Sequence, residues 1–294
     1  MAMRRRWRLV AFIIFSAVIV FGLALYFYHA ENEEVKEQRP APTNERAVIL
    51  RDVPSENVKG KYVPDGKAAR DKARTARKKI AILIDDIGYD LSTVDRLLEI
   101  DAPLTFAILP HCAHSVDAAN ILHKARREIL LHLPMEPHTF PGENPGTGAL
   151  LLRMTDAEIR KTVARDIDAV PHLAGVNNHM GSSFMEDGMK VQTVFTELKR
   201  RKLFFVDSRT TPLSKGPEIA KRLGLRFASR KIFIDNDHDF MSTFQNLTTR
   251  IDTNGQGLVM IGHPRMETIA ALRKAIPILR ARGIDVVPVS ALVE

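Results

Sequence analysis

The stretch of sequence that decides the fold is Lys79-Ile80-Ala81-Ile82-Leu83-Ile84-Asp85-Asp86-Ile87-Gly88. Its apolar run from Ile80 to Ile84 is unbroken, which predicts a strand that is buried on both faces. The run ends in Asp85 and Asp86, and buried charge is costly unless it is paired or bound to a metal. In parallel α/β folds ligands bind at the carboxyl edge of the sheet. The stretch therefore predicts either a functional site or, equally, a turn in which an aspartate caps the next helix.

Apolar strands and amphipathic helices alternate from Ile80 to the end of the chain. The expected helices include one opened by a Thr155–Glu158 capping box and running to Ala169, one over 187–201 and one over 269–281. The expected strands are Ile80–Ile84, Leu104–Leu109, Glu128–Leu131, Leu173–Asn177, Leu203–Val206, Phe233–Ile234, Gly257–Ile261 and Ile284–Val287. Such alternation makes a parallel sheet, either open or closed. The number of units favours an α/β fold in which residues 79–294 form a (β/α) barrel of about seven strands.

Three segments precede this predicted barrel. Residues 1–8 are a basic tail, and residues 9–28 form an apolar stretch that is long enough to span a bilayer core, about 20 residues. The arginines of the tail predict a cytoplasmic N-terminus, which places the barrel on the periplasmic side of the inner membrane behind a single transmembrane anchor. The competing interpretation is a cleaved signal peptide and a secreted protein. Residues 29–78 are charged, contain four prolines and predict a flexible linker.

The positive charge of the chain lies outside the predicted barrel. The net charge is +8, and residues 1–79 alone carry 17 Lys and Arg against 9 Asp and Glu. Because the remaining residues are neutral and show no clustered basic face, we expect no nucleic-acid partner. The single cysteine, Cys112, excludes an intramolecular disulfide and a metal site built from cysteines.

Carboxylates and imidazoles recur where the predicted strands end. Five strand ends carry them, at Asp85-Asp86, His132, His179, Asp207 and His263. A lone histidine on an apolar strand is more often a hydrogen-bonded core residue, but five such ends on one barrel edge indicate a site. Asp86, His132 and His179 would form a set that leaves positions open for water and substrate, as a catalytic divalent ion needs. The stretch from Pro134 to Gly148 has no periodicity and predicts a functional loop.

Six motifs, taken in order, resemble the divergent polysaccharide deacetylases, a branch of the metal-dependent carbohydrate esterases. They are Ile84-Asp85-Asp86-Ile87-Gly88, Leu104-Thr105-Phe106-Ala107-Ile108-Leu109-Pro110, Leu131-His132-Leu133-Pro134-Met135-Glu136-Pro137, Asn177-Asn178-His179-Met180-Gly181-Ser182, Phe205-Val206-Asp207-Ser208-Arg209-Thr210 and Ile261-Gly262-His263-Pro264-Arg265. The resemblance covers about Lys78 to the C-terminus. It implies a distorted (β/α) barrel and the removal of N- or O-acetyl groups from glycans.

The resemblance also implies roles for the ligand set. Asp85 matches the general base and Asp86 the metal ligand of an Asp-Asp-Gly motif, although Ile87 intervenes before the glycine here. His132 matches the first histidine of a His-x-x-x-His-Pro motif. Glu136 stands where the second histidine is expected, so either Glu136 binds the metal or His179 replaces the missing imidazole, and we prefer His179.

The remaining roles concern acid catalysis and support. His263 matches the general acid, and Asp207 is expected to orient another site residue without binding the metal itself. The usual arginine motif on strand four is absent, so Arg209 or Arg265 is expected to orient the base. Asn178 is a further candidate for contact with substrate or ligands.

These residues predict an enzyme, a metal-dependent hydrolase that removes acetyl groups from an envelope polysaccharide or another glycan. The expected cofactor is a divalent metal, with zinc as the first candidate. The departures at Glu136 and on strand four favour an alternative, a catalytically inactive barrel that binds glycan or an envelope protein. A third interpretation is a metallohydrolase acting on another ester or phosphoester, which the lack of a glycine-rich phosphate loop disfavours.

Overall fold

The computed structural model describes residues 78–236, 239–249 and 257–294. The expected basic tail, the anchor over 9–28 and most of the linker lie outside these residues. Within the described ranges, no helix is both long and apolar enough to cross a bilayer.

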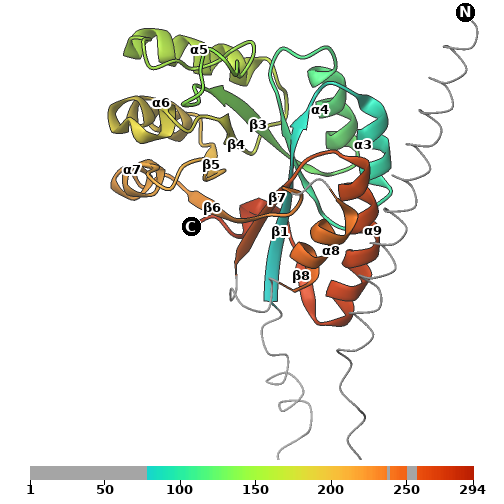
Figure 1. The fold of residues 1–294 in the computed structure, drawn as a ribbon. Helices are drawn as coiled ribbons and strands as arrows, with labels where there is room; N and C mark the ends of the chain where they lie inside the picture. The colour runs from blue at the N-terminus through green and yellow to red at the C-terminus, as the bar shows by residue number, and fades with distance from the viewer. Residues whose placement is uncertain (1–77, 237–238, 250–256) are drawn as a thin grey trace, which may run out of the picture. The chain divides into compact units, whose positions relative to one another are not determined.

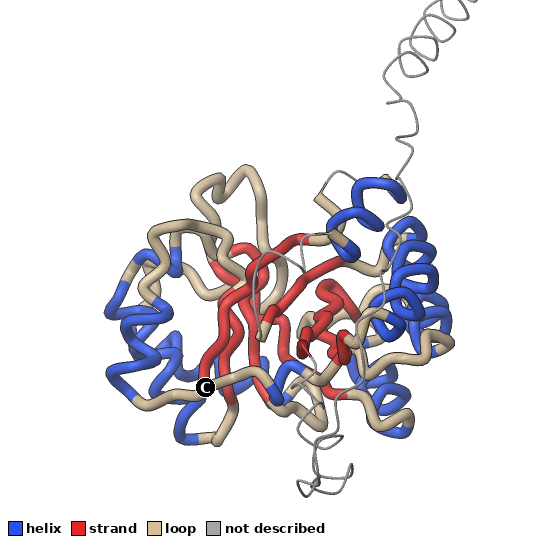
Figure 2. Tube along the Cα trace, turned by 90° about the horizontal axis from the view of Figure 1, so that it is seen from below, coloured by secondary structure: helices blue, strands red, loops and turns tan. Residues whose placement is uncertain are grey.

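Seven parallel strands close into a barrel, as Figures 1 and 2 show. The ring runs β2-β3-β4-β5-β6-β7-β1, and a pairing between β1 and β2 closes it. The strands are β1 (Lys78–Ile87), β2 (Thr105–Ile108), β3 (Glu128–Met135), β4 (Gly175–Met180), β5 (Phe204–Asp207), β6 (Phe227–Phe233) and β7 (Leu258–Gly262). The eighth predicted strand, β8 (Ile284–Val286), stays outside the ring and pairs only with the first three residues of β1. The expectation of a (β/α) barrel of about seven strands is confirmed.

Helices cover the outside of the barrel, so that the strands lie at the centre in Figure 2. They are α3 (Leu91–Leu98), α4 (Ser115–Lys124), α5 (Asp156–Asp168), α6 (Gly188–Arg200), α7 (Gly216–Leu223), α8 (Phe240–Thr248) and α9 (Met266–Ala281), with short 3-10 turns at Phe184–Glu186 and Val289–Ala291. The Thr155 capping box opens α5 as the sequence predicted. Helix α9 begins three residues earlier than predicted because Arg265, in extended conformation, precedes its first turn.

Side chains of the strands alternate between two apolar layers. On β1, Ile80, Ile82 and Ile84 pack into the layer between strands and helices, whereas Ala81 and Leu83 point into the barrel. All five are fully buried, which explains why the run contains no polar residue. The same alternation continues along the strand and directs Asp85 into the barrel interior.

Three strands extend further than predicted, and the extensions carry the polar residues. β1 continues through Asp85 and Asp86, β3 through His132, and β4 through His179. Strand β6 was predicted only at 233–234, whereas it spans Phe227–Phe233. Most of its residues are only partly buried, so this strand lacks the apolar run that identifies the others.

Candidate metal centre

Strand register brings the predicted site residues to one end of the barrel interior. His132 on β3 lies opposite Asn177 on β4, and Pro134 lies opposite His179. These inward positions continue the face that carries Leu130, which packs in the barrel interior. Because side chains alternate along a strand, His132, Asn177 and His179 face the barrel interior, as Asp85 does.

Asp86 reaches the barrel interior through a local distortion of β1. Regular alternation would turn its side chain outward, but the pairing of β1 with β2 is irregular between Ile84 and Ile87. Asp86 has a φ of 57°, in the left-handed region that residues other than glycine seldom adopt. The distortion brings two adjacent carboxylates to the barrel interior.

Three potential ligand atoms converge at this end of the barrel interior. Asp86 Oδ1 lies 3.1 Å from His132 Nε2 and 3.2 Å from His179 Nδ1. The two ring nitrogens are themselves 3.1 Å apart. Asp86, His132 and His179 form the cluster of potential metal ligands found among the described residues, with all ligand atoms within 4.8 Å of one another.

Asn177 links this cluster to Asp85. Its Oδ1 lies 2.9 Å from His132 Nδ1, and its Nδ2 donates to Asp85 Oδ1 at 2.8 Å. The Nδ2 also donates to Ser208 Oγ at 3.2 Å. Asp85, 3% exposed, has its second oxygen 3.6 Å from His132 Nε2. One amide therefore contacts both a histidine of the cluster and the candidate base.

His263 approaches from the opposite side and is held by Asp235. Its Nε2 lies 3.9 Å from Asp86 Oδ2, and its Nδ1 lies 3.0 Å from Asp235 Oδ1. Asp235 is buried and also accepts hydrogen bonds from the His263 amide at 2.6 Å and from Thr268 Oγ1 at 2.8 Å. Asp235 thus fixes the imidazole of His263 with its Nε2 directed at the cluster.

The surroundings of the cluster shift the pKa values of the two adjacent carboxylates in opposite directions. Burial raises the pKa of Asp85 above its ordinary value, although the nearby charge of His132 opposes the rise. Burial acts on Asp86 in the same direction, but its close contacts with His132 and His179 outweigh burial and hold its pKa far below the ordinary value. Neighbouring aspartates with opposite shifts are suited to different roles.

The histidines respond to the same carboxylates. Burial lowers the pKa of His132, but the charges of Asp85 and Asp86 outweigh this effect and raise it to about 9. Burial likewise disfavours the charged form of His263, yet the hydrogen bond and charge of Asp235 raise its pKa above the ordinary value.

The supporting residues expected from the sequence lie in other places. Glu136 accepts a hydrogen bond from the Leu152 amide at 2.8 Å, which places its carboxylate on the β3–α5 loop rather than in the cluster. Asn178 binds the Met180 carbonyl and the Ser208 amide, both at 2.8 Å. Asn178 therefore joins β4 to the loop after β5 and faces away from the cluster.

The carboxylate of Asp207 also binds its own loop. It accepts hydrogen bonds from the Arg209 amide and from Ser214 Oγ, both at 2.7 Å. His263 is held instead by Asp235, a residue that the sequence analysis missed. A signal was present, because Asp235 directly follows the predicted strand 233–234 and makes this a sixth strand end with a carboxylate or an imidazole.

Neither arginine expected to orient the base does so. Arg265 donates to the Asp235 carbonyl at 2.8 Å, and the Arg209 side chain is exposed. A third arginine, Arg230 on β6, lies within the electrostatic influence of Asp207 and Asp85. Burial lowers the pKa of its guanidinium, and these two carboxylates only partly oppose the effect. Arg230 donates to the Ser208 carbonyl at 2.6 Å and to the Arg209 carbonyl at 2.9 Å. The hydrogen-bond donor of Asp85 is Asn177, which shares an inward face with His179.

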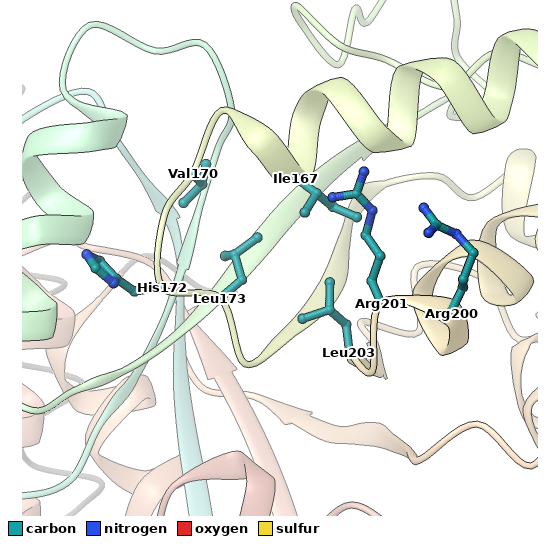
Figure 3. Close-up of a pocket in the computed structure, with 7 residues that line it drawn as sticks. All are labelled: Ile167, Val170, His172, Leu173, Arg200, Arg201 and Leu203. Atoms are coloured by element: carbon teal, nitrogen blue, oxygen red, sulfur yellow. The ribbon is translucent and has the colours of Figure 1, made fainter.

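A separate hollow of about 590 Å³ opens near the start of β4 and β5, at the other end of the barrel (Figure 3). Its lining contains apolar side chains and Arg200 and Arg201. Both guanidinium groups pair with Glu197, and Arg201 also pairs with Asp168. Their charges are already neutralised, so this hollow offers no free cationic group for an anion.

Comparisons with known proteins agree with the fold. YibQ, an uncharacterised protein of Escherichia coli strain K12, is 31% identical over 201 residues, which cover 67% of this chain and 62% of YibQ. An uncharacterised protein of Haemophilus influenzae is 32% identical over 200 residues, covering 67% of this chain and 71% of its own.

A solved structure shares the fold. The crystal structure of an uncharacterised protein from Agrobacterium tumefaciens C58 superimposes with a TM-score of 0.70 at 24% identity, covering 74% of this chain and 90% of that one. The family model described as divergent polysaccharide deacetylase matches residues 82–293, which include every element of the barrel ring. This chain belongs to the divergent polysaccharide deacetylase family.

Proposed function

We propose that this protein is a metal-dependent hydrolase that removes acetyl groups from a glycan. The observation that carries the proposal is the convergence, at one end of the barrel interior, of three groups with complementary chemistry. These are the Asp86–His132–His179 cluster, the buried carboxylate of Asp85 and the imidazole of His263 supported by Asp235.

The cluster fits a divalent cation. Asp86 Oδ1 is buried and lacks a hydrogen-bond donor of suitable geometry, although two imidazole nitrogens lie within 3.2 Å of it. A buried polar atom without a donor is costly, and a cation is a partner that satisfies an oxygen and two nitrogen lone pairs together. Two imidazoles and a carboxylate with open positions suit zinc, which when bound polarises an acyl oxygen and lowers the pKa of water.

The other groups supply the proton transfers of an amide or ester hydrolysis. Asp85 accepts a proton from the water that attacks the acetyl carbon. His263, held with its Nε2 toward the cluster, donates a proton to the departing amine or alkoxide as the bond to the acetyl group breaks. Acetate and a free amino or hydroxyl group on the sugar are the products. The contacts of Asp85 with His132 and of His263 with Asp86, at 3.6 and 3.9 Å, support this assignment.

The surface around the candidate site is suited to a large ligand. Among the described residues, the exposed large apolar side chains all belong to the loops and first helical turns that follow the barrel strands: Tyr89, Val116, Met189, Leu213, Met241 and Met266. Single exposed apolar residues are ordinary, but apolar surface gathered on one side marks an interaction site. A polymer extending beyond the acetylated sugar would contact the rim formed by these six side chains, which supports a polysaccharide as the substrate.

The test is acetate release from acetylated chito-oligosaccharide and from peptidoglycan by the zinc-loaded protein. Asp85→Asn is expected to keep the metal and lose turnover by at least about 100-fold, because it removes the base and leaves the three ligands. Asp86→Ala is expected to lose both metal and turnover. Asp95→Asn, an exposed aspartate on α3, is the matched control and should match the wild-type protein.

Two results would contradict the proposal in different ways. Full metal occupancy in Asp86→Ala or His132→Ala would show that the ligand assignment is wrong. Retention of glycan without acetate release by the zinc-loaded wild-type protein would identify the barrel as a binding protein instead.

A further inference from the structure

We infer that Asn177 is a positioning residue that sets the proton on His132 and orients Asp85 through the two ends of one amide. The inference rests on the proposed function and deepens it by naming what replaces the expected base-orienting arginine. Asn177 is fully buried, and both ends of its side chain have partners.

The direction of the amide follows from its partners. A base carboxylate only accepts hydrogen bonds, so the group that lies 2.8 Å from Asp85 Oδ1 must be the NH₂ of Asn177. The carbonyl end is then the group that lies 2.9 Å from His132 Nδ1. A carbonyl only accepts, so Nδ1 of His132 must carry the hydrogen.

The consequence for His132 is a defined tautomer. In the neutral imidazole, the form that binds a metal, Nδ1 carries the hydrogen and the lone pair is on Nε2, which lies 3.1 Å from Asp86 Oδ1. Metal-binding histidines generally donate their second ring N–H to an acceptor that fixes the tautomer and the ring orientation. Asn177 provides that acceptor here from the neighbouring strand.

The consequence for Asp85 is a fixed orientation across the barrel. Asn177 donates from β4 to a carboxylate on β1, and its NH₂ also donates to Ser208 Oγ after β5. An arginine could not make both contacts, because a guanidinium donates hydrogen bonds and accepts none. An asparagine has one donor end and one acceptor end, which is what the joint contact requires.

Two substitutions test the carbonyl and NH₂ ends of the Asn177 side chain separately. Asn177→Asp keeps an oxygen that accepts from His132 and removes the donor to Asp85. We expect its zinc affinity, measured by competition with a chelator, to stay within about threefold of wild type, while kcat falls about 10- to 100-fold with little change in KM. Asn177→Ala removes both ends, and we expect zinc affinity and kcat each to fall about 10- to 100-fold.

The measurements use the full chain, with Co²⁺ absorption as a second report on the ligand set. Asn120→Asp is the matched control, since the same change is made on the exposed face of α4. Equal loss of zinc affinity in Asn177→Asp and Asn177→Ala would overturn the histidine half of the inference. An unchanged kcat in Asn177→Asp would overturn the aspartate half.

The remaining outcomes are also decisive. Should thermal unfolding show that Asn177→Asp does not fold, Asn177→Ala tests both halves, because retained zinc affinity or retained kcat contradicts the corresponding half. If the wild-type protein binds zinc but releases no acetate, the proposed hydrolase fails while the zinc measurements still test the contact with His132. A wild-type protein that binds no zinc overturns both.

Discussion

At the scale of single residues, the site depends on a backbone conformation that few side chains adopt. Asp86, His111, Met180 and Arg209 all have positive φ angles, between 51° and 61°, and all lie at or just beyond the ends of barrel strands. Such residues cost about 1–3 kcal/mol each and cluster at functional sites. The sequence showed adjacent aspartates, but period-two alternation places one inward and one outward. Nothing in the residue types showed that a left-handed conformation at Asp86 would bring both into the barrel interior.

Tyr89 offers a test of substrate contact at this scale. Its side chain is 68% exposed and lies three residues after Asp86, at the start of the rim. Replacing Tyr89 by Ala should raise KM for the polysaccharide by about 2- to 10-fold, because an aromatic contact is worth about 0.5–1.5 kcal/mol. The kcat should stay near wild type, and Tyr89→Phe should restore KM. An unchanged KM in Tyr89→Ala would exclude this side chain from the binding surface.

Asp166 is a buried carboxylate outside the site, and its ionisation carries a cost. Its Oδ1 pairs with His111 Nε2 at 2.8 Å, whereas its buried Oδ2 has no hydrogen-bond partner. Burial raises its pKa, and the contacts with His111 and Arg165 only partly oppose this. The folded state therefore holds the proton more tightly than the unfolded chain, so this residue's contribution to stability falls as pH rises through the raised pKa.

The isosteric change Asp166→Asn removes this cost. The variant should have a larger free energy of unfolding than wild type at about pH 7, and the difference should shrink as pH falls toward about 4, the ordinary pKa of an aspartate. Urea unfolding across this pH range measures the difference, with Asp95→Asn as the exposed control. A difference that grows as the pH falls would show the opposite sign and reject the explanation.

At the scale of secondary-structure elements, the apolar layers were predictable and the polar continuations of the strands were not. β1, β2 and β7 carry apolar runs that fill both layers, so their cores were found from sequence. β6 was mostly missed because it is only partly buried, and Arg230 was missed with it. Likewise, Asn178 was chosen as a site residue instead of Asn177. The predicted strand ended at Asn177 and did not define which of the two side chains faces the barrel interior.

Gly175 tests how tightly the barrel interior is packed. A Cβ at this position would lie 2.5 Å from Cε2 of Phe204, whose ring fills the interior beside β4. Gly175→Ala should destabilise the protein by about 1–3 kcal/mol, because inserted atoms in a packed core force neighbours out of place. Urea unfolding measures the change, and Gly188→Ala provides a control in which the nearest atom to the new Cβ, Ile219 Cδ1, lies at an ordinary contact distance of 3.6 Å. A smaller loss at Gly175 than at Gly188 would contradict the packing.

At the scale of the whole molecule, the barrel is neutral, and the positive charge belongs to residues 1–79. We propose that residues 9–28 anchor the barrel to the periplasmic face of the inner membrane, on the strength of the arginines before this apolar stretch. Removing residues 2–28 should keep the protein in the cytoplasm, because the chain loses its export and anchoring signal. If the whole chain is expressed with a tag and the product in the soluble periplasmic fraction is shorter by about 25 residues, a cleaved signal peptide is indicated instead.

The central claim is that one cation binds where β1, β3 and β4 bring Asp86, His132 and His179 together. Crystals of the protein prepared with zinc and measured at the zinc absorption edge test it most directly. The account predicts one strong anomalous peak about 2 Å from the Asp86 carboxylate, His132 Nε2 and His179 Nδ1. A cluster without anomalous density, or a peak bound by other residues, would contradict it.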